Sequence, residues 1–71
     1  MRDERLANRL RVARAGRHLT QEALADLIGT TRKSINAIEM QRMVPSTLLA
    51  LKIARALDTS VEHLFSLVAD E

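Results

Sequence analysis

Apolar residues recur at spacings of three and four along almost the whole chain, with charged and polar residues between them. This spacing predicts amphipathic α-helices, and no stretch shows the strict alternation of a half-buried strand. Glycine, proline and the capping residues threonine and serine interrupt the pattern at regular intervals. We therefore expect one all-α domain over residues 1–71, built from five short helices with tight connections.

The first two expected helices each end at a glycine. The first runs from Asp3, as a possible N-cap, to Ala15, and Gly16 stops it. Its inward positions are Leu6, Leu10 and Ala13, with Val12 at their edge. The second begins after Thr20, as N-cap, and ends at Gly29. Its inward positions are Leu24, Leu27 and Ile28.

The third expected helix follows Thr31, as N-cap, and turns Ile35 and Ile38 inward. The segment MQRMVPS, residues 40–46, then forms a loop, since Pro45 keeps the residue before it out of helical geometry. A helix-turn-helix, two short helices joined by a three- or four-residue turn with glycine, is therefore predicted around Gly29.

The last two expected helices begin at hydroxyl side chains. Ser46 caps the fourth, whose inward positions are Leu49, Ala50, Ile53, Ala54 and Leu57. The stretch Thr59-Ser60-Val61-Glu62 contains an S/T-x-x-E capping box and opens the fifth. Its apolar positions are Val61, Leu64 and Phe65.

The size and composition exclude several classes of protein. A chain of 71 residues supports a single small core, and without cysteine it has neither disulfides nor thiolate metal sites. His18 and His63 are far apart and have no second ligand at helical spacing, so we expect no metal and no cofactor. No apolar run is long enough for a membrane span, and the arginine-rich start has no apolar signal segment. We expect a cytoplasmic, nucleoid-associated protein.

An enzyme is not expected. Lys33 and Ser34 are neighbours on a helix and point about 100° apart, so they do not form a catalytic dyad. The chain has no surplus from which to build a substrate pocket, and no small-molecule ligand is expected. A pH-switch role for His63 is a minor alternative.

Positive charge is concentrated in the first part of the chain. Residues 1–42 hold nine Arg and Lys against five Asp and Glu, whereas residues 43–71 hold two against four. This asymmetry favours a polyanion on one side of the domain. A solvated helix surface is the alternative explanation.

The third helix carries side chains suited to DNA. Arg32 and Lys33 can donate to O6 and N7 of guanine or to phosphates, and Asn36 can contact adenine N6 and N7. Ser34 can reach a phosphate or a base, and Thr31 places a positive helix N-terminus beside them. Base contacts concentrate in the first turn of a recognition helix, so this face predicts binding in the major groove.

The segments LTQEALADLIGTTRKSINAIE and LALKIARALDTSVEHLF, joined by a loop containing Pro45-Ser46, resemble the lambda-repressor/Cro (Xre) family of prokaryotic DNA-binding domains. The resemblance covers residues 8–66, leaving 66–71 as a C-terminal tail, and is strongest to short single-domain members. It implies a compact five-helix, lambda-repressor-like domain that regulates transcription, most simply as a repressor of a palindromic operator.

The resemblance also implies roles for individual residues. Gln21 matches a family glutamine that touches backbone phosphate and braces the recognition helix, and Arg42 matches a basic position that meets phosphate. Thr31 and Ser34 would join them in positioning the DNA backbone. Arg14 and Glu39 match structural positions that would pair with each other.

Two positions depart from the family pattern. Met40-Gln41 stands where members usually have Asn-Gly, so either Gln41 is left-handed or the helix is extended. Asp58 replaces a common glycine after the fourth helix, and Asp tolerates the left-handed conformation better than most residues.

Apolar residues outside the expected core predict a homodimer. Scattered exposure is the alternative, but so small a core favours additional burial. The expected interface comprises Leu48, Leu51, Leu64, Phe65, Leu67 and Val68.

Two other functions use the same fold. A protein-interaction module would favour exposed apolar or aromatic anchors on the third helix, where this chain has cations, hydroxyls and an amide. An antitoxin would bind DNA and also hold a toxin, although the tail is short for wrapping one.

Overall fold

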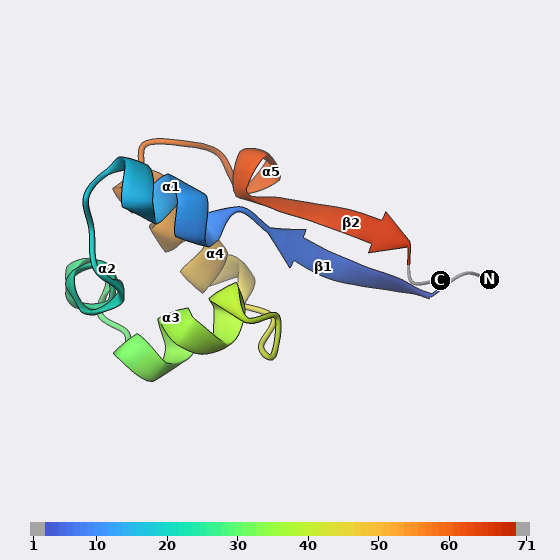
Figure 1. Cartoon of the computed structure of the whole chain (residues 1–71), viewed down its shortest axis with the longest axis horizontal. Coiled ribbons are helices and arrows are strands. Elements are labelled where there is room, and N and C mark those ends of the chain that lie inside the picture. The colour runs from blue at the N-terminus through green and yellow to red at the C-terminus, as the bar shows by residue number, and fades with distance from the viewer. Residues whose placement is uncertain (1–2, 70–71) are drawn as a thin grey trace.

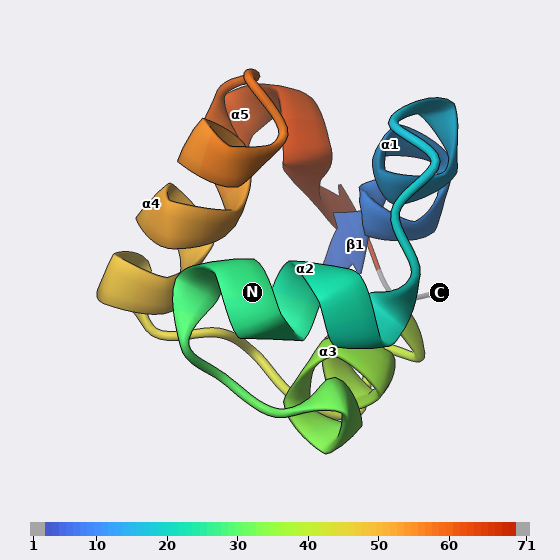
Figure 2. The same cartoon turned by 90° about the vertical axis from the view of Figure 1, so that its left-hand side faces the viewer.

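The computed structural model describes residues 3–69, which form a helical body with a two-stranded ribbon projecting from one side (Figure 1). The helices are α1 (Leu10–Gly16), α2 (Gln21–Ile28), α3 (Arg32–Glu39), α4 (Thr47–Ala56) and α5 (Val61–Leu64). The strands are β1 (Glu4–Asn8) and β2 (Phe65–Ala69). Helix α2 crosses the body between α1 and α4, with α3 packed beneath it (Figure 2).

The predicted N-caps of α2, α3 and α4 are confirmed. Thr20, Thr31 and Ser46 have extended backbones, and each side-chain oxygen accepts a hydrogen bond from an N–H in the first turn. The capping box is different, because Ser60 rather than Thr59 caps α5, accepting from the N–H of His63. Hydroxyl caps therefore begin four of the five described helices.

The first four helices end in one shared way. The residue after each last turn has a positive φ, and the N–H of the following residue donates to the carbonyl five positions earlier. The positive-φ residues are His18 (56°), Gly29 (75°), Gln41 (62°) and Asp58 (53°). This is the Schellman closure, which normally selects glycine. The left-handed alternative for Gln41 is confirmed, as is the left-handed Asp58, whereas Gly16 lies in the last turn of α1 and is not its stop.

The expectation of a purely helical fold is wrong at both ends of the chain. Residues from Asp3 to Asn8 do not extend α1, because β1 pairs antiparallel with β2. The register places Glu4 opposite Ala69, Leu6 opposite Leu67 and Asn8 opposite Phe65. Leu6 and Leu10 have helical spacing, but the alternative hydrogen-bond partner of this segment lies at the far end of the sequence, where local periodicity cannot reveal it.

The core lies between the helices and the base of the ribbon. Its buried members are Leu10, Leu24, Ala25, Ile28, Ile35, Ile38, Ala50, Ile53, Ala54, Leu57, Leu64 and Phe65. Two predicted positions are wrong, since Val12 and Leu27 are each 64% exposed, and Ala25 faces inward on α2. Phe65 also lies beyond the end of α5, as the first residue of β2. The inward direction of Ile35 and Ile38 is confirmed, and it fixes which face of α3 points to solvent.

Candidate nucleic-acid interface

The α2–α3 connection presents the start of α3 to solvent. Gly29 adopts the left-handed conformation, and the N–H of Thr30 donates to the carbonyl of Ala25, which closes α2. Thr31 returns to an extended backbone and caps α3 directly. The chain therefore reverses in a few residues, and the first turn of α3 lies at the end of the body away from the ribbon (Figure 1).

The predicted base-contacting side chains share one exposed surface. Arg32, Lys33 and Asn36 are all exposed and line a common shallow hollow. Lys33 and Asn36 also line a neighbouring hollow that extends to the exposed Arg42. Two cations, an amide and the loop arginine thus lie side by side on one face, a set of donors matched to base edges and phosphates.

Thr31 and Ser34 form the edge of this surface. The Thr31 hydroxyl oxygen accepts from the Ser34 N–H at 3.1 Å, and its O–H donates to Ser34 Oγ at 3.1 Å. Ser34 is half-buried, whereas Thr31 is exposed. Both hydroxyls are therefore held in the first turn of α3, where the helix dipole attracts anions.

An ion pair braces the other end of α3. Arg14 on α1 donates from Nε to Glu39 Oε2 at 2.8 Å and from a terminal nitrogen to Oε1 at 3.2 Å, so the predicted pair is confirmed. The same guanidinium donates to the carbonyl of Leu19 at 2.7 Å. The side chains of Arg14 and Glu39 are only 14% and 4% exposed. A desolvated, two-point pair of this kind is costly to break on one side only.

Gln21 connects that brace to the exposed face. Its amide nitrogen donates to Glu39 Oε1 at 3.2 Å and to Asn36 Oδ1 at 3.1 Å. The Asn36 carbonyl oxygen therefore points toward α2, which directs the Asn36 amide nitrogen elsewhere. Because a carbonyl oxygen has two lone pairs, Asn36 keeps one acceptor site and its donors for another partner.

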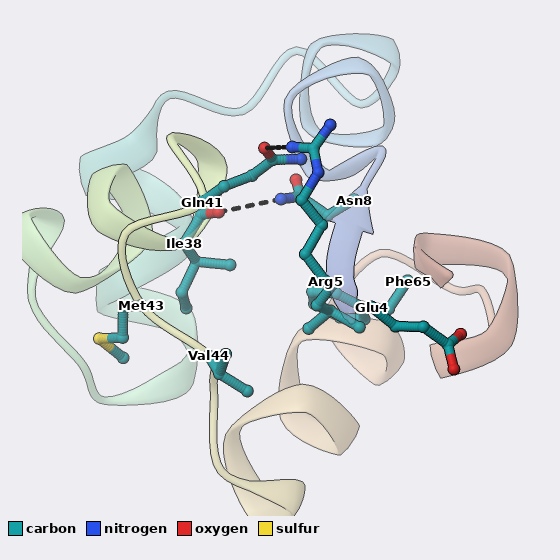
Figure 3. A pocket seen from close by; sticks show the side chains of 9 residues that line it. Glu4, Arg5, Asn8, Ile38, Gln41, Met43, Val44 and Phe65 are labelled. Carbon is teal, nitrogen blue, oxygen red and sulfur yellow. Dashed lines mark hydrogen bonds between the residues drawn. The ribbon is translucent and has the colours of Figure 1, made fainter. Parts of the chain in front are cut away.

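Two further polar contacts run from β1 to the end of α3 and to the turn after it, and the sequence pattern did not predict them. Asn8 donates to the carbonyl of Ile38, and Arg5 donates to the Gln41 side chain (Figure 3). The sequence pattern places Arg5 and Asn8 in the first expected helix, from which their side chains would not be predicted to reach the end of α3. No sequence signal short of recognising the strand would have found them.

Two absences hold for residues 3–69. No described helix is long and apolar enough to cross a membrane. No group of three or more His, Cys, Asp or Glu within the described part of the chain is arranged to hold a metal ion.

A family model described as helix-turn-helix matches residues 10–64, which is most of the chain. The chain belongs to the Cro/C1-type (Xre) helix-turn-helix family. It is therefore a DNA-binding regulator of transcription.

Relatives of this Cro/C1-type chain match it nearly end to end. It is 41% identical to an uncharacterized HTH-type transcriptional regulator of Methanocaldococcus jannaschii over 66 residues, 93% of this chain and 100% of the relative. It is 40% identical to the uncharacterized HTH-type regulator YgzD of Bacillus subtilis, covering 84% of this chain and 91% of YgzD. Among solved structures, the restriction-modification controller protein C.AhdI of Aeromonas hydrophila is 36% identical with a TM-score of 0.73, covering 78% and 83% of the two chains.

In this Cro/C1-type chain, a residue other than glycine closes α3. Gln41 takes the left-handed conformation, with a φ of 62°, that usually selects glycine at a helix end. The loop still turns tightly, because the N–H of Arg42 donates to the carbonyl of Ala37 at 2.8 Å. The departure in sequence therefore leaves Arg42 exposed beside Lys33 and Asn36.

Proposed function

We propose that this regulator binds double-stranded DNA sequence-specifically as a homodimer on a palindromic operator and represses transcription by occlusion. One observation carries the proposal. Arg32, Lys33 and Asn36 lie exposed together on α3, and Gln21 already orients the Asn36 amide. Orienting side chains before binding lowers the entropy that ordering them would cost, which is what a base-contacting surface requires.

The contacts divide by chemistry. Arg32 and Lys33 would donate to guanine edges, and Asn36 would contact adenine through its remaining acceptor site and its amide donors. The residues that would position the DNA backbone are Gln21, Thr31, Ser34 and Arg42. Of these, Gln21 is half-buried with its amide bonded to two acceptors. Both N–H donors of its side-chain amide are used in these bonds, and its oxygen can only accept, so a phosphate contact at Gln21 would come from its backbone N–H in the first turn of α2.

A second copy of this chain would cover one continuous apolar surface. Leu48 and Leu51 are 64% and 56% exposed on α4, and Leu51 also lines a groove shared with Leu6 and Val61. Leu6 pairs across the ribbon with Leu67, which is 69% exposed. Two predicted interface residues, Leu64 and Phe65, are buried within the single chain and are left out. The surface proposed here is Leu48, Leu51 and Leu67, because the half-buried Val68 follows Leu67 on β2 and so lies on the opposite face of the ribbon.

Selection of bound duplexes from a random DNA library at near-physiological salt tests the DNA-binding proposal. Enrichment of a palindrome with half-sites about 10 bp apart is the expected result. The Asn36→Ala variant should lose preference at one position, whereas Arg11→Ala, which removes an exposed arginine on α1, should keep the motif. Salt-sensitive binding without any enriched sequence would contradict the proposal, because phosphate contacts alone give that behaviour.

Sedimentation velocity tests the homodimer separately. Leu48→Glu should sediment as a monomer at a concentration where the wild type is a dimer. Leu27→Glu is the matched control, because Leu27 is equally exposed at 64% and lies outside the proposed surface on α2. A wild type that stays monomeric on its enriched duplex would refute the homodimer.

A further inference from the structure

The ribbon enters the helical body at Asn8, and that side chain touches two helices. Its Oδ1 accepts from the N–H of Leu10 at 3.1 Å, in the first turn of α1. Its Nδ2 donates to the carbonyl of Ile38 at 2.9 Å, in the last turn of α3 (Figure 3). The next residue along, Arg9, donates its backbone N–H to the carbonyl of Leu64 on α5 at 2.8 Å. One short junction therefore joins three helices.

The orientation of the Asn8 amide follows from its partners. A flipped amide would set its NH2 group against the Leu10 N–H and its oxygen against the Ile38 carbonyl. Both contacts would then be repulsive, so only one orientation satisfies the network. The two ends of the Asn8 amide thus have different partners: the oxygen accepts from the first turn of α1, and the nitrogen donates to the last turn of α3.

The bond to Ile38 acts directly on the recognition helix. The Ile38 carbonyl also accepts the N–H of Gln41, so its two lone pairs are divided between the helix closure and Asn8. Between β1 and the segment after α3 lies a cavity of about 340 Å³, lined by Leu6, Met43 and Val44 among others. The hydrogen bonds from Asn8 and Arg5 span this gap from β1 (Figure 3).

We propose that Asn8 is a positioning residue for DNA recognition: from β1, its amide donor fixes the C-terminal end of α3 and so sets the placement of the base-contacting side chains. The consequence for base discrimination rests on the proposed function. Asn36 lies only two residues before Ile38, on the same rigid helix. A small tilt at Ile38 therefore displaces the Asn36 amide, and bidentate base contacts tolerate little displacement.

Two variants remove the donor to the Ile38 carbonyl and keep an acceptor for the Leu10 N–H. Asn8→Asp keeps an oxygen for the Leu10 N–H but loses the donor to Ile38. Asn8→Ser keeps a hydroxyl that can cap α1 and is one bond shorter than the amide, without introducing charge near the end of α3. Arg9→Lys is the control at the same junction, because the Arg9 side chain is exposed and its backbone bond to Leu64 is retained.

Amide hydrogen exchange supplies the first readout and needs no DNA. In both Asn8 variants, exchange at Gln41 and Arg42 should accelerate roughly three- to ten-fold, as expected for the loss of one hydrogen bond. The amide of Thr59 is the internal reference, since it donates to Ala54 in the same closure at the end of α4. Arg9→Lys should leave all three unchanged.

Base discrimination supplies the second readout. The probe is the duplex enriched with the wild type, compared with the same duplex changed at the base pair where Asn36→Ala relaxes preference. The ratio of the two dissociation constants should fall roughly three- to ten-fold in both Asn8 variants. It should stay unchanged in Arg9→Lys. A merely less stable protein would lose folded molecules equally for both duplexes and would not change this ratio.

Each outcome decides the proposal. Faster exchange with a reduced ratio supports it. Unchanged exchange at Gln41 and Arg42 overturns it, and so does faster exchange with an unchanged ratio, because Asn8 would then stabilise the helix end without affecting recognition. A wild type that enriches no sequence refutes the proposed function instead, and the exchange measurement alone then decides whether Asn8 holds α3.

Discussion

The two ends of α3 differ in how many bonds from other elements hold them. At the N-terminal end, Thr31 and Ser34 bond to each other, and Arg32 and Lys33 extend into solvent. At the C-terminal end, bonds arrive from three other elements: Arg14 on α1, Gln21 on α2 and the residues of β1. The comparison shows how a chain this small can expose a cationic helix face and still fix its position. The side-chain bonds from other elements are concentrated at the C-terminal end of α3, away from Arg32 and Lys33.

The largest expected effect comes from removing the main brace. Arg14→Ala leaves the Glu39 carboxylate desolvated without its cation, so the free energy of unfolding should fall by about 3–5 kcal/mol. Urea denaturation measures it. Arg17→Ala, which breaks an exposed pair with Asp58, should cost no more than about 1 kcal/mol. Equal losses in the two variants would show that burial does not distinguish these pairs.

Core truncation under α3 should be nearly as damaging. Ile35 is fully buried, and Ile35→Ala should lower the free energy of unfolding by about 2–5 kcal/mol through lost burial and a residual cavity. Thermal melting checks it beside Leu27→Ala, where a mostly exposed leucine is shortened. If Ile35→Ala melts at the wild-type temperature, the inward face of α3 has been misassigned.

On the exposed face of α3 the same kind of truncation should affect recognition more than folding. Arg32→Ala or Asn36→Ala should cost about 1–3 kcal/mol in binding to the enriched duplex and relax preference at one base pair. The free energy of unfolding of Arg32→Ala should stay within about 0.5 kcal/mol of wild type, as for other surface substitutions. Asn36→Ala also removes the acceptor of the Gln21 amide, so it should lose a further hydrogen bond worth about 0.5–1.5 kcal/mol. Fluorescence anisotropy on single-substituted duplexes measures the binding term. A loss that is uniform across sequences would assign that residue to phosphate contact.

The smallest effect concerns two left-handed residues that close helices, His18 after α1 and Gln41 after α3. His18→Gly removes a left-handed strain of about 1–2 kcal/mol and should stabilise the domain by part of that amount. Gln41→Gly relieves the same strain but also removes the acceptor for Arg5, a hydrogen bond worth about 0.5–1.5 kcal/mol. Its gain should therefore be smaller. Equal gains in urea denaturation would mean that the Arg5 contact adds nothing to stability.

Most of the helical body could be predicted because its signals are local. Thr20, Thr31 and Ser46 mark helix starts by side-chain chemistry that acts within three residues. The exposure of Arg32, Lys33 and Asn36 followed from the inward direction of Ile35 and Ile38. Within α2, the prediction for Leu27 is wrong because leucine and alanine compete for the inward positions, and Ala25 is the buried one of the two.

The ribbon could not be predicted in the same way. Leu6 has the spacing of a helical position relative to Leu10, and its strand partner Leu67 lies at the opposite end of the sequence. The contact from Asn8 to Ile38 joins residues 30 positions apart in the sequence, so local periodicity cannot indicate it. The part of the candidate site that depends on Asn8 was therefore invisible to periodicity, whereas the part on α3 was visible.

Pairing the two ends of the described chain has a consequence for how the molecule folds. Joining Glu4 to Ala69 requires the intervening chain to close into a loop, and such non-local contacts slow folding relative to helix formation. A circularly permuted chain, with a short turn linking β2 to β1 and new termini in the loop at residues 40–46, would convert this pairing into a local hairpin. Stopped-flow refolding should then be faster than in the natural order. An unchanged rate would place ribbon closure after the rate-limiting step.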